Sequence, residues 1–260
     1  MTQAGQEDLS AVLPQAGTAP ELEWLEDGVP RAGRFGDTYF SRAGGLAETG
    51  HVFHAGNGLP QRMAGRQGFT IGELGFGTGL NLLATLKLIR TLEAPPQLTF
   101  LSFEAYPLTL AQLERAHAAF PDVAGEAAEL RPALAGMASD DGALTPGWHL
   151  AAMDGARLWL GIGDARSLLP ELTSGRGPEG LLSVLPVEAW FLDGFSPAKN
   201  PELWSPELMA SVHGLTAAGG TFATYSAAGW VRRNLEAAGF EVERIKGFAG
   251  KRQMMRGARR

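Results

Sequence analysis

The chain has 260 residues, 45% of them hydrophobic, which is enough apolar material for one large domain. No apolar run is long enough to cross a bilayer and the N-terminus has no signal-peptide pattern, so we expect a cytoplasmic protein without membrane contact. The lack of cysteine excludes disulfides and thiolate catalysis, the five scattered histidines indicate no metal site, and the net charge of −6 argues weakly against nucleic acid as a partner.

The charge is distributed unevenly along the chain. Residues 1–30 contain six acids and no lysine or arginine, whereas residues 244–260 contain seven basic residues and no acid. Residues 1–20 include two prolines and few large apolar side chains, which predicts a flexible N-terminal arm. The basic C-terminal end fits either a solvated tail or a contact with RNA, and composition alone does not choose between them.

Residues 21–66 are irregular and rich in glycine, with short β-like pieces at 37–41 and 51–54, and we expect them to form an N-terminal lobe or lid. From residue 67 to residue 260 strands and helices alternate with short connections. This pattern predicts an α/β fold with a doubly wound, mostly parallel sheet and ligands at the carboxyl ends of the strands. The expected strands are 69–73, 98–104, 148–153, 156–162, 187–193, 220–225 and 240–245, and the expected helices are 80–92, 108–120, 123–137, 166–172, 207–215 and 228–238.

A glycine-rich loop directly follows the first of these strands. Glycines at 75, 77 and 79 allow the backbone to turn sharply and to approach an adenosyl group, with the amides of the next helix pointing at it. A dinucleotide fingerprint needs a glycine at position 80, where this chain has Leu80. Glu73 suits the cationic S-adenosylmethionine and would repel a pyrophosphate. The candidate cofactor-binding residues here are Glu73, Gly75, Phe76, Gly77, Gly79 and Asn81, with Asn57 from the N-terminal lobe.

Further acids follow the next strands of the predicted sheet. Glu104 offers two coplanar oxygens that could accept hydrogen bonds from ribose hydroxyls. Asp164 could accept a hydrogen bond from the adenine amino group while Ala165 donates its backbone amide. Any one such acid could be a helix cap or a solvated side chain, but several in register predict one cofactor crevice.

The densest feature is the segment WFLDGFSPAKNPELW at residues 190–204. A buried strand ends there in Asp193 and continues into a loop that contains aromatic, amide, lysine and proline residues. Such a loop predicts a substrate site above the cofactor. A proline-stiffened structural loop is the alternative, but an acid so close to a buried strand needs a partner.

Five segments together form a combination that is far more specific than a glycine loop. They are WLEDGVPRAGRFGDTYFS, FTIGELGFGTGLN, WFLDGFSPAKNPELW, TFATYSAAGWVRRNLEAAGF and KGFAGKRQMM. Across roughly residues 22–257 the chain resembles the family of tRNA 5-aminomethyl-2-thiouridine methyltransferases, which is also the methyltransferase half of a bifunctional tRNA-modifying protein. It departs from the usual pattern of that family at Gly36, Ser196, Ala249, Gly250 and Gln253.

The resemblance implies a Rossmann-like fold that uses S-adenosylmethionine to methylate the primary amine of 5-aminomethyl(-2-thio)uridine at the wobble position of tRNA. We expect this chain to lack the FAD-dependent half, so that a separate enzyme supplies the aminomethyl uridine. A protonated amine has no lone pair, and Asp193 is the candidate base that removes its proton. The candidate substrate-binding residues are Phe195 and Tyr225 for the base, Lys199, Lys251 and Arg252 for phosphates, and Asn200.

Three other functions stay open at this point. The first is a methyltransferase that acts on a small molecule or a protein, because the glycine loop does not identify the acceptor. The second is an NAD-dependent oxidoreductase, which Leu80 and Glu73 disfavour. The third is a noncatalytic RNA-binding module, which would leave Asp193 unexplained.

Overall fold

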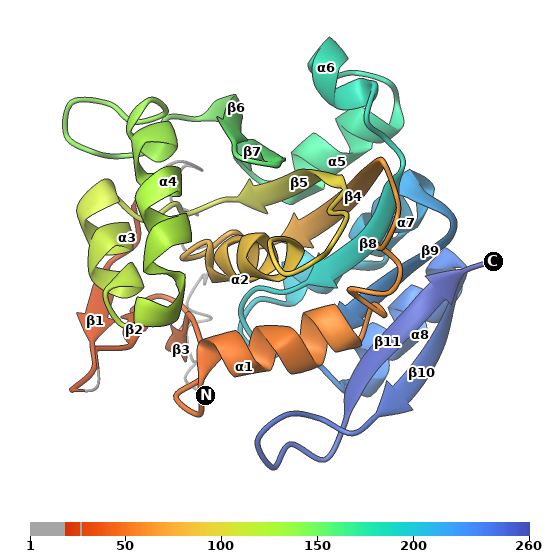
Figure 1. The fold of residues 1–260 in the computed structure, drawn as a ribbon. Helices are drawn as coiled ribbons and strands as arrows, with labels where there is room; N and C mark the ends of the chain where they lie inside the picture. Colours follow the sequence, from red (N-terminus) through yellow and green to blue (C-terminus); the bar gives the residue numbers. More distant parts are fainter. Residues whose placement is uncertain (1–18, 27) are drawn as a thin grey trace, which may run out of the picture.

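The computed structural model describes residues 19–26 and 28–260 (Figure 1). Apart from its last two residues, the expected arm over residues 1–20 lies outside the described part. Within that part, the main sheet has eight strands in the order β10-β11-β9-β8-β4-β5-β7-β6. These strands are β4 (Gly68–Leu74), β5 (Gln97–Glu104), β6 (Gly147–Met153), β7 (Ala156–Ile162), β8 (Val187–Leu192), β9 (Thr216–Thr224), β10 (Phe240–Ile245) and β11 (Met254–Arg259).

The five strands from β9 to β7 in this order are parallel, while β6 pairs antiparallel with β7 and β11 pairs antiparallel with both β9 and β10. The chain runs from β4 to β5 on one side and later returns to place β8 on the other side of β4. The predicted doubly wound, mostly parallel fold is therefore confirmed. Its topological switch point, where such folds bind ligands, lies between β4 and β8.

Helices cover both faces of the sheet (Figure 1). One apolar core contains side chains of α2, α3 and α4, and a second core contains side chains of α5, α6, α7 and α8. Successive residues of a strand point to opposite faces of the sheet and so belong to different cores. On β5, Phe100 lies in the first core and Leu101 in the second. The bounds are α2 (Leu80–Ile89), α3 (Leu110–His117), α4 (Ala124–Ala135), α5 (Ala165–Thr173), α6 (Glu179–Leu182), α7 (Pro206–Leu215) and α8 (Gly229–Ala238), with short turns η2 (Pro121–Val123) and η3 (Pro201–Trp204).

The N-terminal part contains a small antiparallel sheet of β1 (Leu22–Trp24), β2 (Pro30–Ala32) and β3 (Asp37–Thr38), followed by helix α1 (Gly45–Thr49) and a π-helical segment η1 (Gly50–Ala55). The β-like piece expected at residues 51–54 is wrong, because these residues lie in η1. A short apolar run does not distinguish a strand from a buried helix, and Val52 and Phe53 are buried in the first core. The N-terminal part thus shares the core of β4 and α2.

The basic C-terminal end is a strand of the main sheet and not a solvated tail. Met254 and Met255 of β11 are fully buried, and β11 lies between β9 and β10. Arg256 donates to Glu243 of β10, and Arg259 donates to the carbonyls of His213 and Thr216 over 2.9 and 2.6 Å. Arg256 and Arg259 are therefore compensated within the fold, which leaves fewer basic side chains of this end for RNA. Among the described residues, no helix is long and apolar enough to cross a membrane.

Candidate active site

The loops that follow β4 and β8 touch at the switch point. A Cβ atom on Gly75 would lie only 3.0 Å from Cα of Gly194, so the two backbones can meet this closely only because a glycine stands there. A cavity of about 660 Å³ lies against this contact, a size typical of small-molecule sites. Its walls come from residues 34–35 and 37–42, from α1, η1 and the start of α2, and from the loops that follow β4, β5, β7, β8 and β9, together with Lys251.

The glycine loop forms a wall without side chains at its tightest points. Gly75, Gly77 and Gly79 have φ values of 84°, 54° and 73°, a region that favours glycine. A Cβ atom on Gly77 would lie 3.2 Å from the ring of Tyr39, which faces the loop from the N-terminal part. The cavity is lined by Gly75, Phe76, Gly77 and Asn81 but not by Gly79. Gly79 is the N-cap residue of α2 and lies against the ring of Phe76.

Glu104 stands at the end of β5, at the cavity wall. Its Oε2 accepts a hydrogen bond from the amide of Gly77 over 2.7 Å, and its Oε1 accepts from the amide of Tyr106 over 2.8 Å. Burial raises the pKa of Glu104, and these amide hydrogen bonds counteract the shift. Each oxygen keeps a further lone pair, so the carboxylate is held in one orientation while it can still accept from a ligand.

Asp164 and Ala165 also line the cavity, at the start of α5. Asp164 caps that helix by accepting from the amide of Arg166 over 2.8 Å, and the guanidinium of Arg166 contacts both of its oxygens. This arrangement differs from the free acceptor that we expected. A ligand's amino group would have to share the carboxylate with Arg166.

Asp193 is joined to Glu73 through one amide group. Nδ2 of Asn81 donates to Oδ2 of Asp193 over 2.8 Å and to Oε1 of Glu73 over 2.9 Å. The Asn81 Oδ1 accepts from the hydroxyl of Thr49 over 2.7 Å, and Ser102 donates to the other oxygen of Glu73. The second oxygen of Asp193 accepts from the amide of Gly194 over 2.9 Å. The amide of Asn81 thus fixes two carboxyl groups at once.

The two acids have different access to the cavity. Asp193 lines it, whereas Glu73 is fully buried behind Asn81 and does not. Glu73 therefore cannot meet a ligand directly, which corrects the expectation that it faces the cationic cofactor. Burial raises the pKa of Glu73 well above its usual value, and burial raises the pKa of Asp193 from 3.8 to about 7. Glu73 tends toward the neutral form, and Asp193 can exchange a proton near neutral pH.

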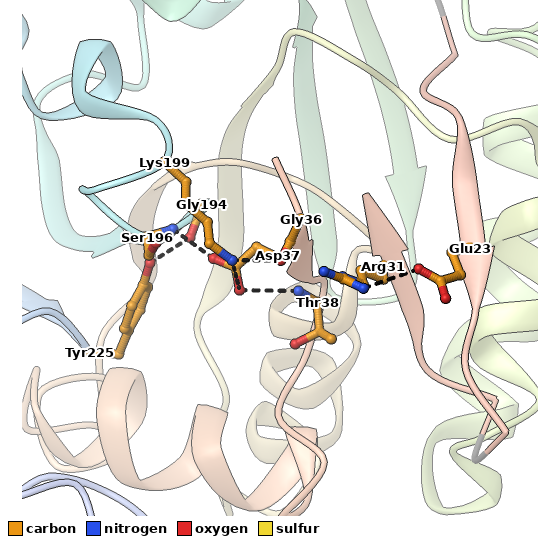
Figure 2. A network of polar contacts seen from close by, with 9 residues as sticks. All are labelled: Glu23, Arg31, Gly36, Asp37, Thr38, Gly194, Ser196, Lys199 and Tyr225. Carbon is orange, nitrogen blue, oxygen red and sulfur yellow. Dashed lines mark hydrogen bonds and ion pairs between the residues drawn. The ribbon is translucent and has the colours of Figure 1, made fainter. Parts of the chain in front are cut away.

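The loop after β8 is held from two sides (Figure 2). Asp37 of β3 accepts from the amide of Ser196 over 2.9 Å and forms an ion pair with Lys199 at 3.8 Å, and Lys199 also donates to the carbonyl of Gly36. From the other side, the hydroxyl of Tyr225 donates to the carbonyl of Gly194 over 2.8 Å. Lys199 therefore helps to hold the loop after β8 against the N-terminal part and does not line the cavity.

Aromatic rings from distant segments form one side of the cavity. Phe195 is stacked on Phe35 with ring centres 4.4 Å apart, and Tyr39 meets Phe195 edge-on at 5.2 Å. Tyr106 lies 5.8 Å from Phe35, and the guanidinium of Arg34 lies over both of these rings. Of these residues only Phe195 was predicted from the sequence. Arg34, Phe35 and Tyr39 lie in one of the segments that carry the family resemblance, but no sequence pattern marked them, or Tyr106, as cavity residues.

Lys251 enters the cavity from the loop between β10 and β11. Its Nζ lies 3.0 Å from Oε1 of Glu48 and 4.9 Å from the ring centre of Tyr225, and both of these residues also line the cavity. Arg252, the next residue, is exposed and does not line the cavity. Of the three basic residues that were predicted to meet phosphates, Lys251 lines the cavity, whereas Lys199 and Arg252 do not.

Two further predicted residues differ in their placement. Asn200 lines the cavity at the end of the loop after β8. Asn57 lies outside it and is buried, where it donates to the carbonyls of Phe53 and Trp190 and accepts from Thr221. Asn57 therefore ties η1 to β8 and β9 and has no contact with the cavity. Sequence patterns gave no signal for Glu48 or Thr49, whose importance depends on partners far along the chain.

Comparisons with known proteins agree with this architecture. Residues 144–260 match a family described as S-adenosyl-L-methionine-dependent methyltransferase. Relatives from Stutzerimonas stutzeri and Aromatoleum aromaticum, both named tRNA 5-methylaminomethyl-2-thiouridine biosynthesis bifunctional protein MnmC, are 43% and 46% identical over 91% and 92% of this chain. The chain spans about a third of the length of these relatives, 34% and 35%.

A solved structure supports the fold. The crystal structure of MnmC2 from Aquifex aeolicus superposes with a TM-score of 0.65, covers 92% of this chain and 70% of that chain, and is 22% identical. The sheet order, the cavity at the switch point and the sequence matches point to one conclusion. The chain has the fold of the S-adenosyl-L-methionine-dependent methyltransferases, whose family matches residues 144–260, and over more than nine tenths of its length it is similar to a part of the bifunctional MnmC proteins.

Proposed function

We propose that the protein transfers a methyl group from S-adenosylmethionine to the primary amine of 5-aminomethyl(-2-thio)uridine at the wobble position of tRNA. The observation that carries this proposal is Asp193, a carboxylate in the cavity whose pKa of about 7 suits proton exchange with an amine. The names of the relatives, which refer to 5-methylaminomethyl-2-thiouridine biosynthesis in tRNA, support the choice of acceptor.

The residues around the cavity fit S-adenosylmethionine. Gly75 and Gly77 leave the cavity wall free of side chains where an adenosyl group would lie, and a Cβ atom on Gly77 would crowd the ring of Tyr39, which also lines the cavity. Glu104 would accept from the ribose hydroxyls, and the start of α5 at Ala165 would meet the adenine ring. When bound, S-adenosylmethionine supplies an electrophilic methyl group on a sulfonium centre.

Asp193 makes the amine nucleophilic by accepting its proton. An alkyl ammonium has a pKa of about 10, so an ordinary aspartate near 4 would face a gap of roughly 6 pKa units. Burial raises the pKa of Asp193 to about 7, which narrows this gap to about 3 units, or roughly 4 kcal/mol. Asn81 and the amide of Gly194 hold the carboxylate in one orientation during this step.

The aromatic wall around Phe195 is the proposed contact for the uridine ring, because rings at this position exclude water and stack on bases. Arg252 is the proposed phosphate contact outside the cavity. The reaction consumes the aminomethyl group and does not make it, so the proposal requires a separate activity that supplies this group.

The proposal is tested with the purified chain, labelled S-adenosylmethionine and two pools of the same tRNA, one with the aminomethyl group and one without it. We expect label in the first pool alone. Label in neither pool, or in both pools equally, would contradict the proposal. Transfer to a small amine or a protein in place of tRNA would favour the alternative acceptor class.

A further inference from the structure

Lys251 places a primary alkyl ammonium inside the cavity that holds Asp193. Its Nζ lies 3.0 Å from Oε1 of Glu48 and 4.9 Å from the ring centre of Tyr225. Glu48 comes from α1 and Tyr225 follows β9, so the chain brings together three distant segments around this one group. A carboxylate beside an aromatic face is a chemical environment that selects ammonium groups.

The ion pair is poorly suited to a purely structural role. The Glu48 side chain is only 17% exposed, while that of Lys251 is 50% exposed and reaches in from a loop. An ion pair with one partner exposed to this extent contributes little to folding. The carboxylate of Glu48, by contrast, is held in a cavity wall where a ligand can reach it.

The substrate of the proposed reaction carries the same functional group as Lys251, a primary ammonium on a carbon chain. We propose that Glu48 and the ring of Tyr225 bind the aminomethyl ammonium of the substrate, and that Lys251 occupies this place until the substrate displaces it. The inference rests on the proposed function and identifies the residues that make the enzyme specific for an amine.

The exchange of ammonium groups also bears on the base. The negative charge of Glu48 raises the pKa of Asp193, and the positive charge of Lys251 lowers it. The substrate ammonium that replaces Lys251 carries the same charge, so it lowers the pKa of Asp193 only until it gives up its proton. After that step Glu48 acts alone, and Asp193 holds the proton more tightly.

The inference is tested by the ratio of two affinities, those of the aminomethyl-bearing tRNA and of the same tRNA without that group. A phosphate contact affects both affinities equally and leaves the ratio unchanged, whereas recognition of the amine changes the ratio. We expect Glu48→Gln to reduce the ratio about tenfold, in line with the loss of a charge-assisted hydrogen bond. Lys251→Met, which removes the competing ammonium, should increase it.

Variants of Tyr225 separate ring contact from folding. Tyr225→Phe keeps the aromatic face and should keep the ratio, while Tyr225→Leu should reduce it. Glu126→Gln, which breaks a comparable ion pair with Arg90 away from the cavity, is the matched control and should have no effect. Binding of S-adenosylmethionine verifies that each variant is folded.

The outcomes separate the two proposals. An unchanged ratio in both Glu48→Gln and Tyr225→Leu, or an equal loss of both affinities in Lys251→Met, would overturn this inference while the wild-type chain still methylates tRNA. If the wild type neither discriminates between the two tRNAs nor methylates either, the proposed function itself fails.

Discussion

Asn81 donates a hydrogen bond from Nδ2 to Oδ2 of Asp193 over 2.8 Å, so a residue of the helix after the glycine loop orients the proposed base. This bond also lowers the pKa of Asp193 against the larger effect of burial. Asn81→Ala should therefore move the pKa of Asp193 above 7 and shift the acidic limb of the pH–rate profile to higher pH. Single-turnover methyl transfer measured across pH checks this.

Asn57→Ala is the matched control for this variant. Asn57 is buried and hydrogen-bonded like Asn81, but it lies outside the cavity. Both variants should lose stability, by about 1–3 kcal/mol each, because buried partners are left unpaired. Only Asn81→Ala should shift the pH profile, and an equal shift in both variants would show that the effect is structural.

Asp193 should make stability depend on pH. Its pKa is raised from 3.8 to about 7, so between these values the unfolded chain has lost a proton that the native chain keeps. Stability therefore falls as pH rises through this window, and Asp193→Asn removes the effect. The free energy of unfolding of the wild type should fall by roughly 2–4 kcal/mol relative to Asp193→Asn between pH 4 and pH 8. If the free energies of unfolding of the wild type and of Asp193→Asn changed equally with pH, the assignment would be contradicted.

The positions of the glycine loop, Glu104, Asp164 and Asp193 were predictable because each follows a strand, and the carboxyl ends of parallel strands converge. The contact between Asp37 and Ser196 was not predictable, because these residues are 159 positions apart and nothing in either segment shows that the two meet. The same holds for Glu48 and Lys251, which are 203 positions apart. Such contacts arise from tertiary packing alone.

Two other differences have local causes. β11 was missed because its arginines and glycine obscure the apolar pattern of a strand, although Met254 and Met255 are fully buried. Glu73 was expected to face a ligand because it precedes the glycines. Asn81, the second residue of α2, covers it, and a strand pattern does not reveal which residue of a later segment lies in front of a side chain.

Gly77→Ala should weaken binding of S-adenosylmethionine, because a Cβ atom would crowd the ring of Tyr39 at 3.2 Å beside the cavity. Gly155→Ala is the control. Gly155 also has a positive φ, 71° compared with 54° for Gly77, but it lies in a turn where a Cβ atom would point into open space. Both variants should lose about 1 kcal/mol of stability from backbone strain. Calorimetry should find weaker cofactor binding in Gly77→Ala only, and unchanged binding there would remove the loop from the cofactor site.

Arg252→Ala should weaken tRNA binding and reduce the slope of log affinity against log salt concentration by about 1, as expected for one lost phosphate contact. Arg256→Ala is the control, because Arg256 is engaged with Glu243. Binding measured across a salt series gives both slopes. An identical slope in wild type and Arg252→Ala would place the RNA contact elsewhere.

Asp193 is the proposed base for methylation of the aminomethyl group of a wobble uridine. This role is best tested by single-turnover reaction of aminomethyl-bearing tRNA with wild type and Asp193→Asn, followed by mass analysis of the released nucleosides. We expect one added methyl group on the amine of that nucleoside in the wild type. We also expect a rate reduced by roughly 10²-fold or more in Asp193→Asn at unchanged cofactor affinity. A methyl group on another atom or nucleoside, or a normal rate in Asp193→Asn, would contradict this role.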